Sequence, residues 1–184
     1  MSIADRVRFP EFLSRVMTAE QAATLIPHGA NVGMSGFTGA GYPKALPQAI
    51  AAHATAQNAS GHPYKLNVWT GASTAAECDG VMAAAGALGQ RLPFNTDPTA
   101  RKAINEGEID FIDMHLSHVA QHAWFGFLGH MHVAVIEVLG VTADGLLIPS
   151  TAVGNNKTWL EIADKVILEI NTKPPAKMEG MHDI

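Results

Sequence analysis

Ser35-Gly36-Phe37-Thr38-Gly39-Ala40-Gly41-Tyr42-Pro43-Lys44 follows the short apolar segment Ala30–Met34 and precedes a helical pattern. The apolar segment is typical of a strand, and Pro43 suits the first turn of a helix whose apolar face includes Leu46 and Ile50. Glycines let a backbone approach a ligand closely, and free N–H groups at a helix start attract negative charge. The stretch therefore predicts a strand–loop–helix unit that cradles an anion or an acyl group.

The rest of the chain also alternates strand-like and helix-like segments. Further strands are predicted at Leu66–Thr70, Ile109–Met114, Val133–Val138, Leu146–Ile148 and Val166–Ile170, with a short segment at Leu92–Phe94 and a hairpin-like turn at Ala143–Gly145. Helices are predicted at Thr18–Ile26, Pro43–Ala54, Ala75–Leu88, Thr99–Asn105, Ser117–Phe127 and Trp159–Ala163. Apolar strands separated by helices predict an α/β fold, with a mostly parallel sheet and helices on both faces.

Composition bounds the class of protein. The chain has 184 residues, which is enough for one domain with a buried core. Its net charge is −5. The acidic balance argues against a general binder of nucleic acid or of a membrane surface. Cys78 is the only cysteine, which excludes an internal disulfide and leads us to expect a reducing compartment, the cytoplasm. The sequence has no apolar run long enough to span a bilayer, and Met1–Phe12 has no signal-peptide core.

The charges are unevenly distributed around the glycine-rich stretch. No Asp or Glu occurs from Gln21 to Ala76, whereas Lys44 and Lys65 lie inside that window. One interpretation is a site kept free of negative charge because its ligand is an anion. The other is an alanine-rich helix surface that happens to carry no acids.

Three polar loops are predicted at the carboxyl ends of strands: Ser35–Tyr42, Gly71–Thr74 and Asn95–Asp97. Ligands of open α/β sheets bind beyond these strand ends. The loops offer N–H and hydroxyl donors without charge, which can hold a carboxylate or a developing oxyanion. Alternatively, each loop is an ordinary turn whose Ser, Thr or Asn side chain caps the next helix. The occurrence of three such loops favours a site.

Nucleotide-binding motifs do not fit the glycine spacing. The order Gly33, Gly36, Gly39, Gly41 is not G-x-G-x-x-G, and no acidic residue follows at the distance that a ribose contact requires. The sequence also contains no G-x-x-x-x-G-K-[ST] motif, so a P-loop is not expected.

Other ionisable residues carry weaker signals. His115, His118 and His122 are close in sequence, but no H-E-x-x-H motif, cysteine or paired carboxylate completes a ligand set, so no metal is expected. Glu137 interrupts an apolar run and is either a functional carboxylate or, more commonly, a hydrogen-bonded buried acid. Cys78 lies between two acids, which disfavours a thiolate nucleophile.

Several motifs in order along the whole chain resemble one family. They are Ser35–Lys44, Thr70-Gly-Ala-Ser-Thr74, Pro93-Phe-Asn-Thr-Asp97, Asp113-Met-His-Leu116, Val153-Gly-Asn155, Lys165-Val-Ile-Leu-Glu-Ile-Asn171 and the closing Glu179-Gly-Met-His-Asp-Ile184. Together they resemble the N-terminal domain of the acetyl-CoA hydrolase/transferase family, which includes succinyl-CoA:acetate and propionyl-CoA:succinate CoA-transferases.

The resemblance implies a specific chemistry. Family members have two α/β domains, and a glutamate attacks an acyl-CoA thioester to form first an acyl–glutamyl anhydride and then an enzyme–CoA thioester. That glutamate is expected beyond Ile184, so no catalytic residue is expected in this chain. Ser73 and Thr96 match residues that line the acyl-carboxylate pocket. The remaining expected substrate-binding residues lie in the loop beside the acyl group: Gly36, Thr38, Gly39 and Gly41.

The resemblance also predicts partners and domain organisation. Coenzyme A is expected as a substrate and not as a permanent cofactor, together with a small carboxylate such as acetate, succinate or propionate. Residues 1–171 are expected to form the N-terminal CoA-transferase domain, and residues 172–184 the start of an interdomain linker. A C-terminal domain or second subunit would complete the enzyme, which is expected to be a homo-oligomer, and the chain alone is expected to be inactive.

Three alternatives stay open. One is an acetyl-CoA hydrolase of the same family, in which water intercepts an intermediate. Another is a noncatalytic subunit or docking domain. The third is a thioesterase that acts through Glu137.

Overall fold

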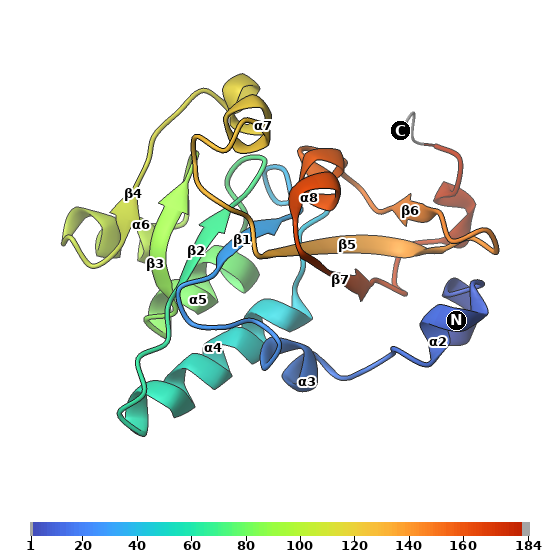
Figure 1. Cartoon of the computed structure of the whole chain (residues 1–184), viewed down its shortest axis with the longest axis horizontal. Helices are drawn as coiled ribbons and strands as arrows, with labels where there is room; N and C mark the ends of the chain where they lie inside the picture. Colours follow the sequence, from blue (N-terminus) through green and yellow to red (C-terminus); the bar gives the residue numbers. More distant parts are fainter. Residues whose placement is uncertain (1, 182–184) are drawn as a thin grey trace.

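The structure, a computed structural model that describes residues 2–181, is built on one sheet (Figure 1). Its strands are β1 (Asn31–Met34), β2 (Leu66–Trp69), β3 (Leu88–Leu92), β4 (Asp110–Phe111), β5 (Val133–Val141), β6 (Leu147–Pro149) and β7 (Lys165–Ile170). Their order is β4-β3-β2-β1-β5-β6, and β7 pairs with β5. Among the described strands, the pair β5–β6 is antiparallel and the other pairs are parallel. The predicted mostly parallel sheet is confirmed.

Helices cover both faces of this sheet, as predicted. They are α1 (Ile3–Arg6), α2 (Pro10–Leu13), α3 (Ala19–Ala23), α4 (Ala45–Ala59), α5 (Val81–Ala84), α6 (Pro98–Asn105), α7 (Leu116–Trp124) and α8 (Asn156–Ile162), with a π-helical turn η1 (Ala76–Gly80) and a 3₁₀ turn η2 (Ala176–Met178). One core cluster contains side chains of α3 to α6, and a second contains Val119 of α7 and Trp159 of α8. In Figure 1, α3, α4 and α5 lie on one side of the sheet, and α7 and α8 on the other.

The predicted helix Ala75–Leu88 is wrong only at its end, after Ala84. The structure has η1 and the short α5, after which Gly86, with φ +64°, turns the chain into strand β3. The strand was missed because Leu88-Gly-Gln-Arg-Leu92 has neither β-branched residues nor an apolar run. Its Arg91 is nevertheless fully buried, because the carboxylate of Asp79 pairs with it.

Other boundaries also differ from the predictions. The helix expected from Pro43 begins at Ala45 and continues to Ala59. The predicted strand at Val133–Val138 extends to Val141, and every residue of it is buried. The hairpin turn predicted at Ala143–Gly145 is confirmed, and it connects β5 to the antiparallel strand β6. The strand β5 pairs with β1, β6 and β7, so it is the central strand of this part of the sheet.

The C-terminal segment lies against the N-terminal helix. Arg6 donates hydrogen bonds to the carbonyl oxygens of Thr172 and Pro174, and Arg8 forms an ion pair with Glu179. Residues 172–181 of the predicted linker are therefore held at the same end of the sheet as α1 (Figure 1). Residues 182–184, the remainder of that predicted linker, lie outside the described residues.

Candidate functional site

The three polar loops meet beyond the carboxyl ends of β1, β2 and β3. The Oγ atom of Ser73 lies 2.7 Å from Oγ1 of Thr96 and accepts a 3.0 Å hydrogen bond from the Thr96 N–H. The N–H of Thr38 in the glycine loop donates to the Ser73 carbonyl oxygen over 2.9 Å. The structure thus brings together Thr38, Ser73 and Thr96, which are far apart in the sequence.

The tip of the glycine loop is a two-residue turn. Phe37 and Ala40 exchange backbone hydrogen bonds of 2.9 and 3.0 Å around Thr38 and Gly39. Both central residues have positive φ, +47° for Thr38 and +79° for Gly39, which is the pattern of a type I′ turn. A threonine in this region of φ is uncommon, because its Cβ crowds the backbone. The turn places Thr38 and Gly39 in solvent.

Two further glycines let the neighbouring loops pack against each other. A Cβ on Gly41 would lie 2.7 Å from the backbone nitrogen of Ala152, and a Cβ on Gly71 would lie 2.8 Å from the carbonyl oxygen of Gly36. Neither distance leaves room for a side chain, so these glycines are needed for close backbone approach.

A buried ion pair lies beneath the Ser73 loop, and the sequence interpretation missed it. Arg91 Nε and Asp79 Oδ1 are 2.8 Å apart, and both side chains have no exposed surface. Burial would raise the pKa of Asp79, but Arg91 and the hydrogen bond from the Thr74 N–H outweigh it and hold that pKa below its usual value. The carboxylate therefore stays charged. Its signal was hidden because Arg91 lies in the unpredicted strand β3.

The start of α4 is not the free anion cradle that the sequence predicted. The carboxylate of Glu169, in β7, accepts hydrogen bonds from the N–H groups of Lys44, Ala45 and Leu46. The acid-free window of the sequence therefore receives a carboxylate from another strand. These N–H groups are taken by the protein itself, so an anion would have to bind elsewhere on the loops.

Glu137 is hydrogen-bonded and buried, the more common of the two interpretations given to it. Its Oε2 lies 2.5 Å from Lys44 Nζ, and its Oε1 accepts a 2.7 Å hydrogen bond from the Ser150 hydroxyl. Its backbone N–H donates to Ser35 Oγ. This network joins β5 to the glycine loop and leaves Glu137 engaged at both oxygens.

Buried amide atoms near the loops have no hydrogen-bond partner among the described residues. They are both side-chain polar atoms of Asn95, which precedes Thr96, and Nδ2 of Asn155. The backbone nitrogen of Asn155 lies 3.8 Å from a Cβ built on Gly71, so its loop adjoins the Ser73 loop. Exposed aromatic rings accompany the polar atoms: Phe37 is 46% exposed and Phe94 52%. The loops thus combine unpaired buried amides with exposed apolar side chains.

Cys78 and the histidines of α7 are the other candidate residues that the sequence raised. Cys78 is completely buried, and burial together with Asp79 raises the pKa of its thiol. The rings of His118 and His122 stack 6.0 Å apart on α7. Within residues 2–181, no group of three or more His, Cys, Asp or Glu side chains is placed to hold a metal ion. In the same part of the chain, no helix is long and apolar enough to cross a membrane.

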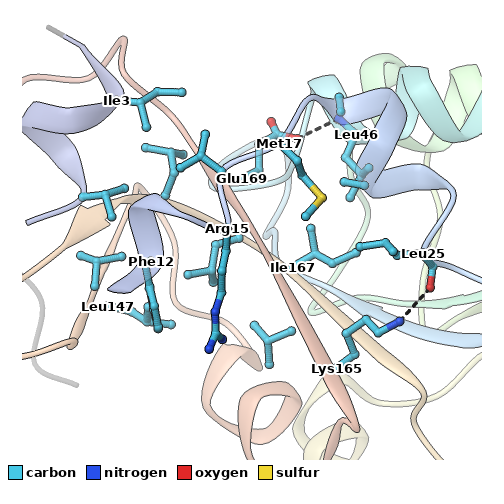
Figure 2. A pocket seen from close by; sticks show the side chains of 18 of the residues that line it. Ile3, Phe12, Arg15, Met17, Leu25, Leu46, Leu147, Lys165, Ile167 and Glu169 are labelled. Carbon is cyan, nitrogen blue, oxygen red and sulfur yellow. Dashed lines mark hydrogen bonds between the residues drawn. The ribbon is translucent and has the colours of Figure 1, made fainter. Parts of the chain in front are cut away.

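A large apolar groove lies elsewhere, along β7 (Figure 2). It has a volume of about 860 Å³, and its lining includes Phe12, Met17, Leu147 and Ile167 but neither Ser73 nor Thr96. Figure 2 also shows Glu169 among the lining residues, with its carboxylate hydrogen-bonded to the backbone N–H of Leu46. The groove is therefore separate from the meeting point of the loops.

Comparisons with known proteins agree with the expected family. The sequence model described as the acetyl-CoA hydrolase/transferase N-terminal domain matches residues 1–184. Succinyl-CoA:acetate CoA-transferase of Clostridium kluyveri is 43% identical over 179 residues, which are 97% of this chain and 33% of that protein. Propanoyl-CoA:succinate CoA transferase of Escherichia coli is 44% identical over 168 residues, or 91% of this chain and 34% of that protein.

An acetyl-CoA hydrolase of Yarrowia lipolytica is 38% identical over 191 residues, covering 99% of this chain and 36% of that protein. The chain thus spans about a third of the length of these relatives.

Solved structures share the fold. RipA from Yersinia pestis matches with a TM-score of 0.68 and 18% identity, over 86% of this chain and 37% of that one. Glutaconate coenzyme A-transferase from Acidaminococcus fermentans matches with a TM-score of 0.61 and 12% identity, over 83% and 68%. These identities support the fold alone, whereas the sequence matches identify the family. The chain belongs to the acetyl-CoA hydrolase/transferase family and comprises its N-terminal domain.

Proposed function

We propose that the protein containing this chain moves coenzyme A between an acyl-CoA and a small carboxylate of the acetate, succinate or propionate class. This chain would form the carboxylate side of the site. The observation that carries the proposal is the Ser73–Thr96 hydroxyl pair, bound to the glycine loop at the ends of β2 and β3. The relatives from C. kluyveri and E. coli, named for such exchanges, support the substrate class.

The hydrogen bonds indicate different roles for the hydroxyls of Ser73 and Thr96. Ser73 is 2% exposed, and its oxygen already accepts the Thr96 N–H. Thr96 is exposed, and either hydroxyl can be the donor in the 2.7 Å contact between them. When Ser73 donates to Thr96 instead of to the Thr74 carbonyl oxygen 3.1 Å away, the Thr96 hydroxyl hydrogen is free to turn toward a bound carboxylate. Thr96 is therefore the proposed direct donor and Ser73 the group that orients it.

The covalent steps in this proposal use a glutamate outside the chain. Its carboxylate oxygen attacks the thioester carbon, the C–S bond breaks and CoA leaves as thiolate, which gives an acyl–glutamyl anhydride. The thiolate then attacks the glutamyl carbonyl and expels the first carboxylate, and a second carboxylate reverses the sequence. Asp79 and Glu137 are held by Arg91 and Lys44, so neither is a free nucleophile. This disfavours a thioesterase that acts through Glu137.

Substitutions in the complete protein test the site. Ser73→Ala and Thr96→Val should each lower kcat/KM for the carboxylate by about 5- to 150-fold, because each removes one hydrogen bond worth about 1–3 kcal/mol. Ser60→Ala is the matched control, since that hydroxyl bonds to the Ala56 carbonyl at the far end of α4. Unchanged kinetics for both site variants would mean that the loops serve only as turns.

The chain by itself provides a second measurement. We expect the purified 184 residues to transfer no CoA from succinyl-CoA to acetate, because the nucleophilic glutamate of the proposed mechanism lies outside them and, within residues 2–181, Asp79 and Glu137 are paired with Arg91 and Lys44. Turnover above the buffer rate would contradict this part of the proposal.

Two alternatives have their own support. Hydrolysis is favoured by the similarity to the Yarrowia lipolytica enzyme, and thiol release from acetyl-CoA without a carboxylate acceptor would reveal it. A docking role is favoured by the apolar groove along β7. We also propose a cytoplasmic homo-oligomer, since the free Cys78 suits a reducing compartment and the exposed Trp124, Phe125 and Phe127 suit burial against further protein.

A further inference from the structure

The buried Arg91–Asp79 pair takes no part in the proposed chemistry, yet it holds the Ser73 loop on both sides. Asp79 Oδ2 accepts a 2.9 Å hydrogen bond from the N–H of Thr74, the residue after Ser73. Arg91 Nη2 donates over 3.3 Å to the carbonyl oxygen of Ala72, the residue before it. The ion pair therefore holds the backbone by hydrogen bonds immediately before and immediately after Ser73.

The same arginine also reaches the end of the next strand. Its Nη1 donates to the carbonyl oxygen of Leu92, the last residue of β3, from which the chain continues to Thr96. In addition, Gly80, next to Asp79, packs against the carboxylate of Asp97, with a Cβ built there only 2.8 Å from Oδ2. The loops of Ser73 and Thr96 thus both contact the Arg91–Asp79 ion pair or the residues next to it.

Stability alone is a poor explanation for such a pair. Removing two full charges from water is costly, and apolar side chains of similar volume often replace a buried ion pair without loss of stability. What an apolar pair cannot supply is a set of directional bonds to the Ala72 carbonyl and the Thr74 N–H. The pair is suited to fixing geometry.

We propose that Arg91 and Asp79 are positioning residues that set the Ser73–Thr96 hydroxyls for the carboxylate substrate. This inference rests on the proposed function of that pair. The bonds between Ser73 and Thr96 are 2.7 and 3.0 Å long, so a small displacement of the Ser73 loop breaks both. Loosening the ion pair should therefore weaken carboxylate binding more than it slows the later chemical steps.

Kinetics of the complete protein separate positioning from mere folding. Arg91→Lys keeps the positive charge but loses the forked donors, so we expect KM for the carboxylate to rise on the order of tenfold with kcat within about twofold. A variant that only folded less well would lower kcat and leave KM unchanged. Arg6→Lys is the matched control, because Arg6 is also buried and binds carbonyl oxygens, but at Thr172 and Pro174.

A double variant tests whether Arg91 acts through Ser73. In a Ser73→Ala background, Arg91→Lys should raise KM far less than in the wild type, because the group being positioned is already gone. Equal effects in both backgrounds would overturn the proposal. The charge-free pair Asp79→Asn with Arg91→Gln serves if Arg91→Lys fails to fold, and it should show the same rise in KM.

Amide hydrogen exchange keeps this inference distinct from the proposed function. Exchange at the Thr74 and Thr96 amides should be faster in Arg91→Lys and unchanged in Arg6→Lys, whether or not the protein transfers CoA. Faster exchange in a protein without carboxylate-dependent transfer would reject the proposed function and keep the loop-positioning role. Unchanged exchange and unchanged KM in an active enzyme would reject the positioning role alone.

Discussion

Thr38 occupies a backbone region that suits asparagine or glycine better, at the tip of the glycine loop. Its φ is +47°, and its neighbour Gly39 has φ +79° with no atom within 4 Å of an added Cβ. Backbone strain of this kind often marks functional loops. Because the surrounding space is open, substitutions at these two positions isolate the conformational cost from any packing cost.

Opposite substitutions in this turn should change stability in opposite directions. Thr38→Asn should raise the free energy of unfolding by about 0.5–1 kcal/mol, and Gly39→Ala should lower it by about 1–2 kcal/mol, since alanine disfavours positive φ. Denaturant titrations of the two variants against wild type measure this. A stabilising Gly39→Ala would show that the loop does not hold this turn.

The site residues illustrate which information the sequence carries. The loops that carry Ser73 and Thr96 were identifiable because each is polar and lies near a predicted strand end. The family resemblance singled out the two residues within them, and the structure brings their hydroxyls together. Arg91 and Asp79 were not, because a single charged residue in a polar segment is normally assigned to the surface. Only the fold reveals that these two charges meet in the interior. The roles of the hydroxyls in binding stay a prediction.

At the scale of elements, α4 depends on a residue that is remote in sequence. Glu169 of β7 accepts hydrogen bonds from the first N–H groups of the helix, although it lies 123 residues away from Leu46. The existence of the helix was predictable from its apolar face. Its start was not, because local signals pointed to Pro43, whereas the carboxylate from β7 caps the backbone at Lys44 and Ala45.

Removing that charge should weaken the helix. Glu169→Gln keeps the shape of the side chain but loses the carboxylate, and we expect a loss of about 1 kcal/mol in the free energy of unfolding. Glu161→Gln is the control, because Glu161 is exposed on α8. Thermal or urea unfolding compares the two. Equal effects would show that the Glu169 cap contributes nothing specific.

At the scale of the whole molecule, the pKa values of Tyr42 and Tyr64 show whether the chain is folded around them. Burial raises the pKa of Tyr64 to about 12, and burial together with Glu77 raises that of Tyr42 to about 12. Tyr64 also donates to the Ile26 carbonyl over 3.0 Å. These are the only two tyrosines in the chain. The folded chain therefore has no tyrosine with an ordinary titration.

Ultraviolet absorbance of phenolate tests this directly. At pH 10.5 the folded 184-residue chain should show little phenolate. In urea more than half of the tyrosines should be ionised, because the ordinary pKa of tyrosine is 10.0. A raised pKa means that folding favours the protonated form. The corresponding stability is therefore present below pH 10 and is lost as the pH rises toward 12. If the folded chain showed as much phenolate at pH 10.5 as the chain in urea, Tyr42 and Tyr64 would not be buried as the structure has them.

The overall architecture was more predictable than its details. Alternating apolar strands and helices specified a parallel sheet with two covered faces, and the ordered motifs specified the family. The placement of β5 between β1 and β7 was not predictable, since pairing order is not encoded in any single segment. The polar character of β3 likewise hid a strand that the sheet requires.

The position of β5 has a consequence for synthesis. β1 ends at Met34 and pairs on one side with β5, which begins only at Val133. At translation rates of about 5–20 residues per second, roughly 5–20 s pass between the emergence of the two strands. During that time one edge of β1 has no native neighbour. The nascent chain thus carries an open strand edge, which can pair with other nascent chains until β5 fills it.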